Sequence, residues 1–190
     1  PSKLEDFVGQ KQILSKGKPL YNLIEGKNIC NCIFYGPPGT GKTTLANIMA
    51  NYVDKKFYKL NATTAIVKDI QDITNNMDNL LSYSGVVLYI DEIQHFNKKQ
   101  QQSLLEFIED GRITLIASTT ENPYFVIHKA IISRCKIFSF KPLDSDDIVI
   151  GLKKSLEKLI KEGIKVTYSE EALKYIAEIS QGDYRKSYNR

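Results

Sequence analysis

An eight-residue stretch with fixed glycine, lysine and threonine positions constrains this chain more than any other feature. Residues 36–43 read Gly-Pro-Pro-Gly-Thr-Gly-Lys-Thr, which matches G-x-x-x-x-G-K-[ST], the pattern of a phosphate-binding loop (P-loop). The mostly apolar run 30–35 before it indicates a buried strand, and residues 44–50 after it indicate a helix. The loop is therefore expected between strand and helix, where backbone N–H groups and the helix N-terminus can face an anion.

The residue types of the loop have chemical reasons. Glycines let the backbone wrap a phosphate chain without a Cβ in the way. Lys42 is expected to reach the β- and γ-phosphates, and Thr43 to place its hydroxyl on Mg²⁺. The residues predicted to bind ATP or ADP are Gly36, Pro37, Pro38, Gly39, Thr40, Gly41, Lys42, Thr43 and Thr44. The alternative is a glycine-rich turn that matches by chance, and the flanking elements argue against it.

A second motif follows the apolar run 86–90, which ends in Asp91 and Glu92. An apolar strand that ends in two carboxylates is unusual unless its tip faces a cation. Asp91 is predicted to hold Mg²⁺, and Glu92 to orient and polarise an attacking water. Acidic pairs at strand ends also occur by chance, but this pair follows the P-loop by about fifty residues, in the order that the chemistry requires.

Strands and helices alternate through residue 140, which predicts an α/β fold with a parallel sheet. The five expected strands are 31–35, 57–60, 86–90, 113–118 and 136–140. Pro142 marks a boundary, so we expect a nucleotide-binding domain at 1–142 and a helical domain at 143–190. Residues 124–132 are expected to form one short helix.

A polar cluster, Ser-Thr-Thr-Glu-Asn-Pro, occupies residues 118–123 after the fourth expected strand. In a doubly wound sheet ligands lie beyond the carboxyl ends of the strands. The cluster is therefore expected next to Asp91. The alternative interpretation is a turn before a proline.

Composition narrows the classes of protein that fit. The net charge is +4, from 26 basic and 22 acidic residues, which is compatible with a nucleic-acid partner. No apolar run approaches the roughly 18 residues of a membrane span, and there is no signal-peptide pattern. The three cysteines are expected to be free thiols in a reducing compartment, and the two histidines to be structural or surface groups. Pro1 in place of Met indicates that the chain was cut from something longer.

The order of these motifs resembles that of AAA+ ATPases, and clamp-loader-like members most. In chain order, the motifs are the P-loop, Asp-Glu at 91–92, the polar strand tip, Ser-Arg-Cys at 133–135 and Gly-Asp-x-Arg at 182–185. Within these, 119–123 and 91–98 resemble the family of replication-associated recombination protein A and its eukaryotic relative, the Werner-helicase-interacting ATPase. Gln94 and His95 depart from the His-Arg that is usual there, which leaves the carboxylates intact. The resemblance implies a five-stranded P-loop domain flanked by helices and a small, truncated helical lid.

The resemblance also implies roles for individual residues. Val8, Gly9 and Gln10 would flank the adenine, and Arg185 would be sensor 2, which reaches from the lid to the nucleotide. Arg134 would be an arginine finger given to a neighbouring subunit, although by residue type alone it is a surface charge.

Sensor 1, which detects the γ-phosphate or the water, would be Thr119 or Thr120, with Asn122 as the next candidate. Lys98 and Lys99 begin the helix that would line a DNA channel, although a solvated helix end explains them equally well.

The function implied is Mg²⁺-dependent ATP hydrolysis that acts on DNA at stalled or damaged replication forks. The DNA bound would be a fork or a junction between single-stranded and double-stranded DNA. The full-length protein is expected to be a homo-oligomer, held by a region beyond residue 190, with single-strand-binding or other replication proteins as candidate partners and no membrane. The expected location is a bacterial cytoplasm, associated with the nucleoid, or a eukaryotic nucleus. One alternative is an ATP-dependent switch or scaffold with negligible turnover, against which Glu92 argues. Another is a phosphotransferase, for which the sequence offers no acceptor-binding segment.

Overall fold

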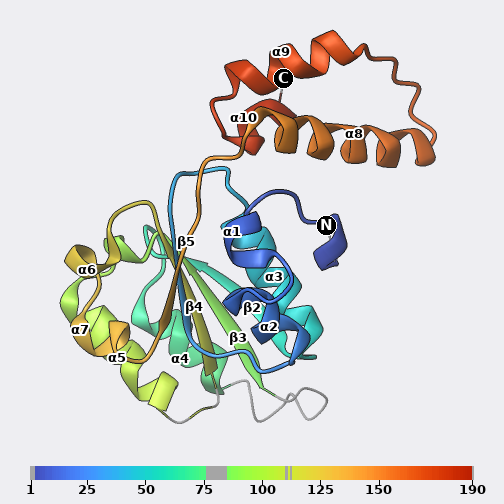
Figure 1. Cartoon of the computed structure of the whole chain (residues 1–190). Helices are drawn as coiled ribbons and strands as arrows, with labels where there is room; N and C mark the ends of the chain where they lie inside the picture. Colours follow the sequence, from blue (N-terminus) through green and yellow to red (C-terminus); the bar gives the residue numbers. More distant parts are fainter. Residues whose placement is uncertain (1–2, 76–84, 110, 112, 190) are drawn as a thin grey trace.

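A sheet of five parallel strands forms the centre of the chain (Figure 1). The computed structural model describes residues 3–75, 85–109, 111 and 113–189. The strand order is β2-β3-β4-β1-β5. The strands are β1 (Cys32–Tyr35), β2 (Lys56–Asn61), β3 (Val86–Asp91), β4 (Ile113–Thr119) and β5 (Lys136–Ser139). The predicted fold class is confirmed, and each strand end lies within one residue of its expected position.

The central strands are apolar on both faces because helices cover both faces of the sheet, as is usual for parallel strands. All residues of β4 and all but the last of β3 are buried. Side chains alternate between the faces along a strand. Val87 and Tyr89 of β3 point to one face, and Leu88 and Ile90 point to the other.

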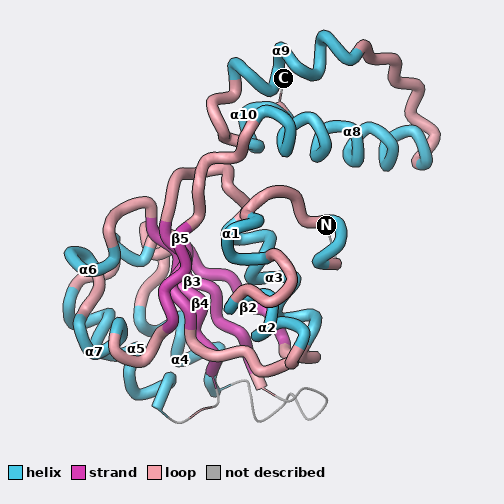
Figure 2. Tube along the Cα trace, in the orientation of Figure 1, coloured by secondary structure: helices cyan, strands magenta, loops and turns pink. Residues whose placement is uncertain are grey.

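Two sets of helices form the outer layers (Figure 2). On the face of Val87 and Tyr89 lie α2 (Pro19–Glu25) and α3 (Lys42–Tyr52), with α1 (Lys11–Leu14) packed beside them. The opposite face is covered by α4 (Val67–Asn75), α5 (Lys98–Glu109) and α7 (Lys129–Ile132). Among the described residues, this part also contains the 3-10 helices η1 (Leu4–Asp6) and η3 (Ile93–His95).

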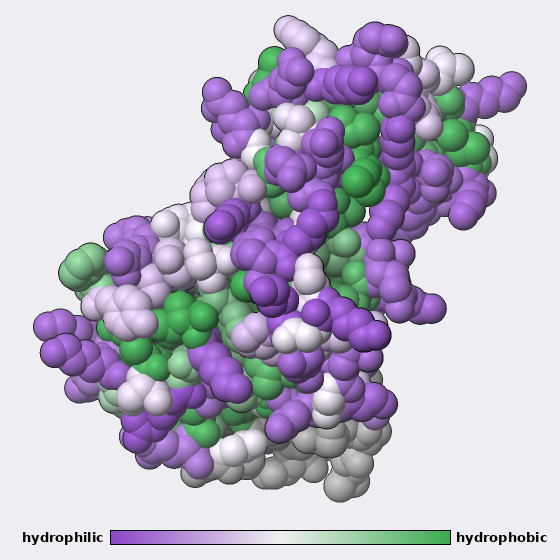
Figure 3. Space-filling model, in the orientation of Figure 1, coloured by the Kyte–Doolittle hydropathy of each residue, from purple (hydrophilic) through white to green (hydrophobic). Residues whose placement is uncertain are grey.

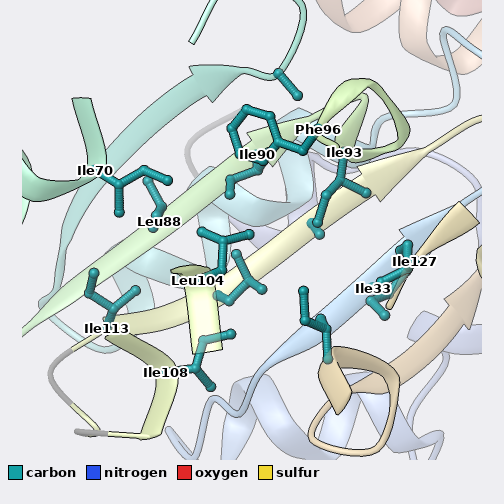
Figure 4. Packing of buried hydrophobic residues seen from close by; sticks show 14 of the residues in the cluster. Ile33, Ile70, Leu88, Ile90, Ile93, Phe96, Leu104, Ile108, Ile113 and Ile127 are labelled. Carbon is teal, nitrogen blue, oxygen red and sulfur yellow. The ribbon is translucent and has the colours of Figure 1, made fainter. Parts of the chain in front are cut away.

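Of the two cores that flank the sheet, the larger lies under α4, α5 and α7 (Figure 4). Ile70 from α4 and Leu104 from α5 meet Leu88 and Ile90 of the sheet, and Ile93 closes the core at the end of β3. All five of these side chains are at most 1% exposed. Burying such a side chain contributes roughly 1.5–3 kcal/mol, so this core fixes β3 and the carboxylates that follow it.

The single helix expected at 124–132 is wrong, because the structure has two short helices there. They are α6 (Pro123–Val126) and α7, and Ile127 between them is extended and buried. The His128 backbone N–H donates to the side chain of Gln101 on α5 at 2.7 Å, so it cannot serve a continuous helix. His128 then caps α7 by accepting from Ala130 N, which confirms a structural role for this histidine.

Three helices follow the sheet and form a separate layer at the end of the chain. They are α8 (Ser145–Lys161), α9 (Glu170–Ile179) and α10 (Tyr184–Tyr188), and they begin at the side-chain caps Asp144, Ser169 and Asp183. They share a small core made of Leu143, Ile148, Leu152, Leu173 and Ala177. In Figure 3 hydrophilic side chains cover most of the visible surface, and hydrophobic ones show between the two long helices of this layer. Among the described residues, no helix is long and apolar enough to cross a membrane.

Candidate nucleotide-binding site

The P-loop connects β1 to α3 and has a backbone that only glycine adopts easily. Gly36, Gly39 and Gly41 have φ angles of 146°, 71° and 93°. A Cβ at Gly36 would meet the backbone carbonyl of Phe140, and one at Gly41 would meet the ring of Phe7. The glycines therefore allow a turn with positive φ and close packing of the loop against its neighbours.

Lys42, the first residue of α3, is 7% exposed and points back into the loop. Its ammonium donates to the carbonyls of Gly36 and Pro37, both at 2.7 Å. Burial lowers the pKa of Lys42, and the nearby carboxylates of Glu92 and Asp91 act in the opposite direction. The loop therefore holds a buried cation where the pattern requires one.

The Thr43 and Asp91 side chains are joined by a third residue, Tyr89. The Thr43 hydroxyl donates to the Tyr89 hydroxyl at 3.0 Å, and that hydroxyl donates to Asp91 Oδ1 at 3.2 Å. Ser118 from β4 donates to the same carboxylate oxygen at 2.7 Å. On the other side of Asp91, Lys59 Nζ lies 3.6 Å from Oδ2. The P-loop threonine and the strand-tip aspartate thus share one hydrogen-bonded cluster.

The period of the strands explains which side chains meet there. Tyr89 and Asp91 are two residues apart on β3, so both point toward the face that α3 covers. On β4, Ile116 packs in the core of that same face, and Ser118 is two residues further along. The polar strand tip therefore lies next to Asp91, as predicted.

Glu92 has left-handed backbone angles, φ 55° and ψ 51°, between β3 and η3. The Gln94 side-chain amide donates to Glu92 Oε2 at 2.5 Å. The Thr120 hydroxyl lies 3.4 Å from the same oxygen. The carboxylate is thus held at the tip of the sheet, close enough to Lys42 to influence its pKa.

The three candidates for sensor 1 lie in different places. Thr120 is exposed and contacts Glu92, whereas Thr119 is fully buried and its hydroxyl accepts from Glu121 N at 3.0 Å. Asn122 caps α6 by accepting from Tyr124 N at 3.1 Å. Among the described residues, only Thr120 of the three brings its side chain to a strand-tip carboxylate.

The N-terminal segment reaches the P-loop through Gln10, which is 3% exposed and has a φ of 56°. Its side-chain amide donates to the carbonyls of Thr40 at 3.3 Å and Lys141 at 2.8 Å, and its oxygen accepts from Lys141 N at 3.0 Å. Val8 and Gly9 are half-buried beside it. The structure therefore brings this segment to the loop and to the chain that leads into α8.

The last helix also approaches the P-loop. Tyr184 N donates to the Gly39 carbonyl at 3.1 Å, and the Asp183 side chain packs where Gly39 has no Cβ. Arg185, which is exposed on α10, lies close enough to Lys42 to contribute to the lowering of its pKa. Arg185 is thus on the P-loop side of the helical layer.

Arg134 lies away from this cluster, just after α7. Its guanidinium pairs with Glu109 at 2.5 Å and also donates to the Ala130 carbonyl at 2.9 Å. It contacts no P-loop residue in the part of the chain that the structure describes. Its side chain is 40% exposed, so another molecule could reach it.

The oxygen groups of the cluster fit the Mg²⁺ that such a loop implies. Thr43 and Asp91 offer a hydroxyl and a carboxylate within hydrogen-bond reach of one shared phenol. Mg²⁺ usually takes one or two protein ligands together with waters and substrate phosphates.

No group of three or more His, Cys, Asp or Glu residues that could hold a metal occurs among the described residues. The three cysteines are free, as predicted.

Comparison with known proteins identifies the family. The model of the AAA family, "ATPase family associated with various cellular activities", matches residues 32–143. The chain belongs to this family. The match begins with β1 and ends just before α8. It includes the P-loop, the Asp91-Glu92 pair and the polar cluster at 118–123.

Two curated relatives of this AAA chain are replication-associated recombination protein A of Escherichia coli (strain K12) and ATPase WRNIP1 of Dictyostelium discoideum. The chain is 38% identical to the first over 192 residues and 40% identical to the second over 202 residues. It matches over its whole length but spans 43% and 22% of those proteins. The resemblance found from the strand-tip motifs is confirmed.

Among solved structures, the chain is similar to RuvB, the Holliday junction branch migration motor of Thermotoga maritima. The TM-score is 0.78 and the identity 26%, over all of this chain and 62% of that one. This similarity supports a P-loop AAA fold that includes the helical layer.

Proposed function

We propose that this AAA chain hydrolyses ATP with Mg²⁺ and uses the cycle to act on DNA at stalled or damaged replication forks. The observation that carries hydrolysis is Glu92, a carboxylate at the strand tip beside the P-loop cation. A protein that only binds nucleotide as a switch does not need this carboxylate. The names of the relatives, replication-associated recombination protein A and a Holliday junction motor, support DNA as the substrate.

In this proposal, Lys42 holds the β- and γ-phosphates, and Thr43 and Asp91 hold Mg²⁺, which supplies positive charge against the phosphate oxygens. Glu92 orients a water for in-line attack on the γ-phosphate and polarises it. Thr120 is the favoured sensor 1, because it contacts Glu92, whereas the side chains of Thr119 and Asn122 accept hydrogen bonds from backbone N–H groups two residues further along the chain.

Two further parts complete the proposed site. Val8, Gly9 and Gln10 flank the adenine, and Arg185 reaches the nucleotide from a lid at 143–190, separate from the nucleotide-binding domain at 1–142. Arg134 acts on the ATP of a neighbouring copy, since its own contacts are with α5 and α7. The full-length protein would therefore work as a homo-oligomer, in the bacterial nucleoid or in a eukaryotic nucleus.

Phosphate release by the full-length protein, measured with and without forked DNA, tests the proposal. We expect ATP to be hydrolysed to ADP and phosphate, faster when DNA is present. Nucleotide binding without release would instead favour the switch or scaffold. Transfer of label from ATP to a small acceptor would indicate a phosphotransferase.

A further inference from the structure

Tyr89 is the largest fully buried side chain in the sheet, and its hydroxyl is part of the proposed metal site. Motif patterns do not single it out, because it lies inside the apolar run of β3. Its ring stacks on Phe57 of β2, with centroids 6.0 Å apart and planes inclined by 29°. Burial and the contact with Phe57 hold the ring in place, and the ring positions its hydroxyl.

The hydrogen bonds of the cluster run in one direction through the Tyr89 hydroxyl, from Thr43 to Asp91. A threonine hydroxyl has one proton and two lone pairs. Because Thr43 gives its proton to Tyr89 at 3.0 Å, both of its lone pairs remain available. Tyr89 gives its own proton to Asp91 Oδ1 at 3.2 Å, and Ser118 donates to that oxygen as well. Oδ1 thus accepts two hydrogen bonds, whereas Oδ2 faces a cation, the Lys59 ammonium at 3.6 Å.

The Tyr89 phenol is the donor in its hydrogen bond to Asp91 Oδ1. A phenylalanine at this position would fill the same space without that donor.

We propose that Tyr89 is a positioning residue for Mg²⁺, which orients the Thr43 hydroxyl and the Asp91 carboxylate through its own hydroxyl. This inference rests on the proposed function, since Thr43 and Asp91 are the metal-holding residues there. Partners that orient metal ligands typically contribute 10–100-fold in metal affinity. The effect should fall on the Mg²⁺ dependence of nucleotide binding and leave metal-free binding unchanged.

The test is Tyr89→Phe in the full-length protein, with ADP affinity measured by calorimetry across a series of Mg²⁺ concentrations. We expect the Mg²⁺ concentration for half-maximal enhancement of affinity to rise about tenfold, with affinity in EDTA unchanged. The matched control is Tyr58→Phe on β2, because the Tyr58 hydroxyl has no hydrogen-bond partner among the described residues. The control should keep the parental Mg²⁺ dependence.

A purely structural tyrosine would give a different result. Tyr89→Phe would then lower the melting temperature without nucleotide but keep the parental Mg²⁺ half-point, and that outcome would overturn the inference. If the parent itself showed no enhancement by Mg²⁺, the metal site of the proposed function would be wrong. Thr43→Ala separates these cases, because it should abolish the enhancement wherever Thr43 is a ligand.

Discussion

The Gln94 side-chain amide donates a 2.5 Å hydrogen bond to the Glu92 carboxylate, two residues away. The short distance is possible because Glu92 has left-handed backbone angles, after which η3 begins. The other polar atom of Gln94, Oε1, is buried without a partner among the described residues. A buried acceptor left unsatisfied costs about 1–3 kcal/mol. The Gln94 side chain therefore makes its contact with Glu92 at the expense of hydrating its own carbonyl oxygen.

Replacing Gln94 with Ala should slow turnover and leave ATP affinity unchanged. Hydrogen bonds to charged groups are worth about 1.5–3 kcal/mol, so we expect kcat to fall by roughly 10- to 150-fold. Steady-state phosphate release by the full-length protein gives kcat, and calorimetry gives the affinity. Gln102→Ala, at an exposed position of α5, is the control. A Gln94→Ala protein with parental kcat would mean that Glu92 does not need this anchor.

The contact between α10 and the P-loop predicts an effect of a small residue change. Gly39→Ala places a Cβ against the side chain and backbone of Asp183, at a φ of 71°. Gly17→Ala is a matched control, because its φ is 84° and nothing lies within 4 Å of the added carbon. Left-handed backbone alone costs roughly 1–2 kcal/mol, and overpacking adds about 1–3 kcal/mol.

We therefore expect Gly39→Ala to lower the free energy of unfolding more than Gly17→Ala, and only Gly39→Ala to weaken ADP binding. Urea denaturation and calorimetry measure the two effects. Equal losses of unfolding free energy and of ADP affinity in both variants would show that the contact of α10 with Gly39 contributes neither to stability nor to nucleotide binding.

The parts of the site that depend on short local patterns could be predicted from the sequence. The P-loop and the Asp91-Glu92 pair carry their spacing in neighbouring residues, and both were found at the expected edge of the sheet. Tyr89 could not be predicted, because a strand residue that serves a site looks like any other apolar residue until its face is known. Its face depends on which helix covers that side of β3, which is a long-range property.

Two other differences have the same cause. The helix expected at 124–132 is interrupted because Gln101, far away in sequence, takes the His128 N–H. Gln94 was found only as a departure from a family pattern, since its contact with Glu92 depends on the backbone turn after β3. Local periodicity predicts elements well and their tertiary hydrogen bonds poorly.

DNA contact by the start of α5 is tested by salt dependence. Lys98 and Lys99 are both exposed there. Each phosphate contact contributes close to one unit to the slope of log K against log salt. The double variant Lys98→Ala, Lys99→Ala of the full-length protein should therefore lose roughly one to two units of slope. The control pair, Lys16→Ala and Lys18→Ala, should keep it, and an unchanged slope in both would identify Lys98 and Lys99 as surface charges.

Action of Arg134 in trans predicts rescue in a mixture. Arg134→Ala chains lack the finger and Lys42→Ala chains lack the phosphate-binding cation, so each full-length variant should be nearly inactive alone. Loss of an arginine finger costs on the order of 10³–10⁵ in rate in related phosphoryl transfers. Mixed oligomers can pair an intact finger with an intact P-loop, so phosphate release should partly recover. A mixture no more active than its components would mean that Arg134 does not act on a neighbour.

In the proposed mechanism the P-loop binds ATP, and Glu92 is needed to hydrolyse it. Glu92→Gln keeps the shape of the side chain but removes its charge. Lys42→Ala removes the buried cation from the loop, which should cost about 3 kcal/mol, or on the order of 100-fold in nucleotide affinity. Glu106→Gln, the same change at an exposed position of α5, is the control.

The most direct measurement is the identity of the nucleotide that stays bound after the full-length protein is incubated with labelled ATP and Mg²⁺ and separated from free nucleotide. We expect to find ATP on Glu92→Gln, ADP on the parent and on Glu106→Gln, and almost no nucleotide on Lys42→Ala. ADP on Glu92→Gln at the parental rate, or full retention by Lys42→Ala, would contradict the proposed mechanism.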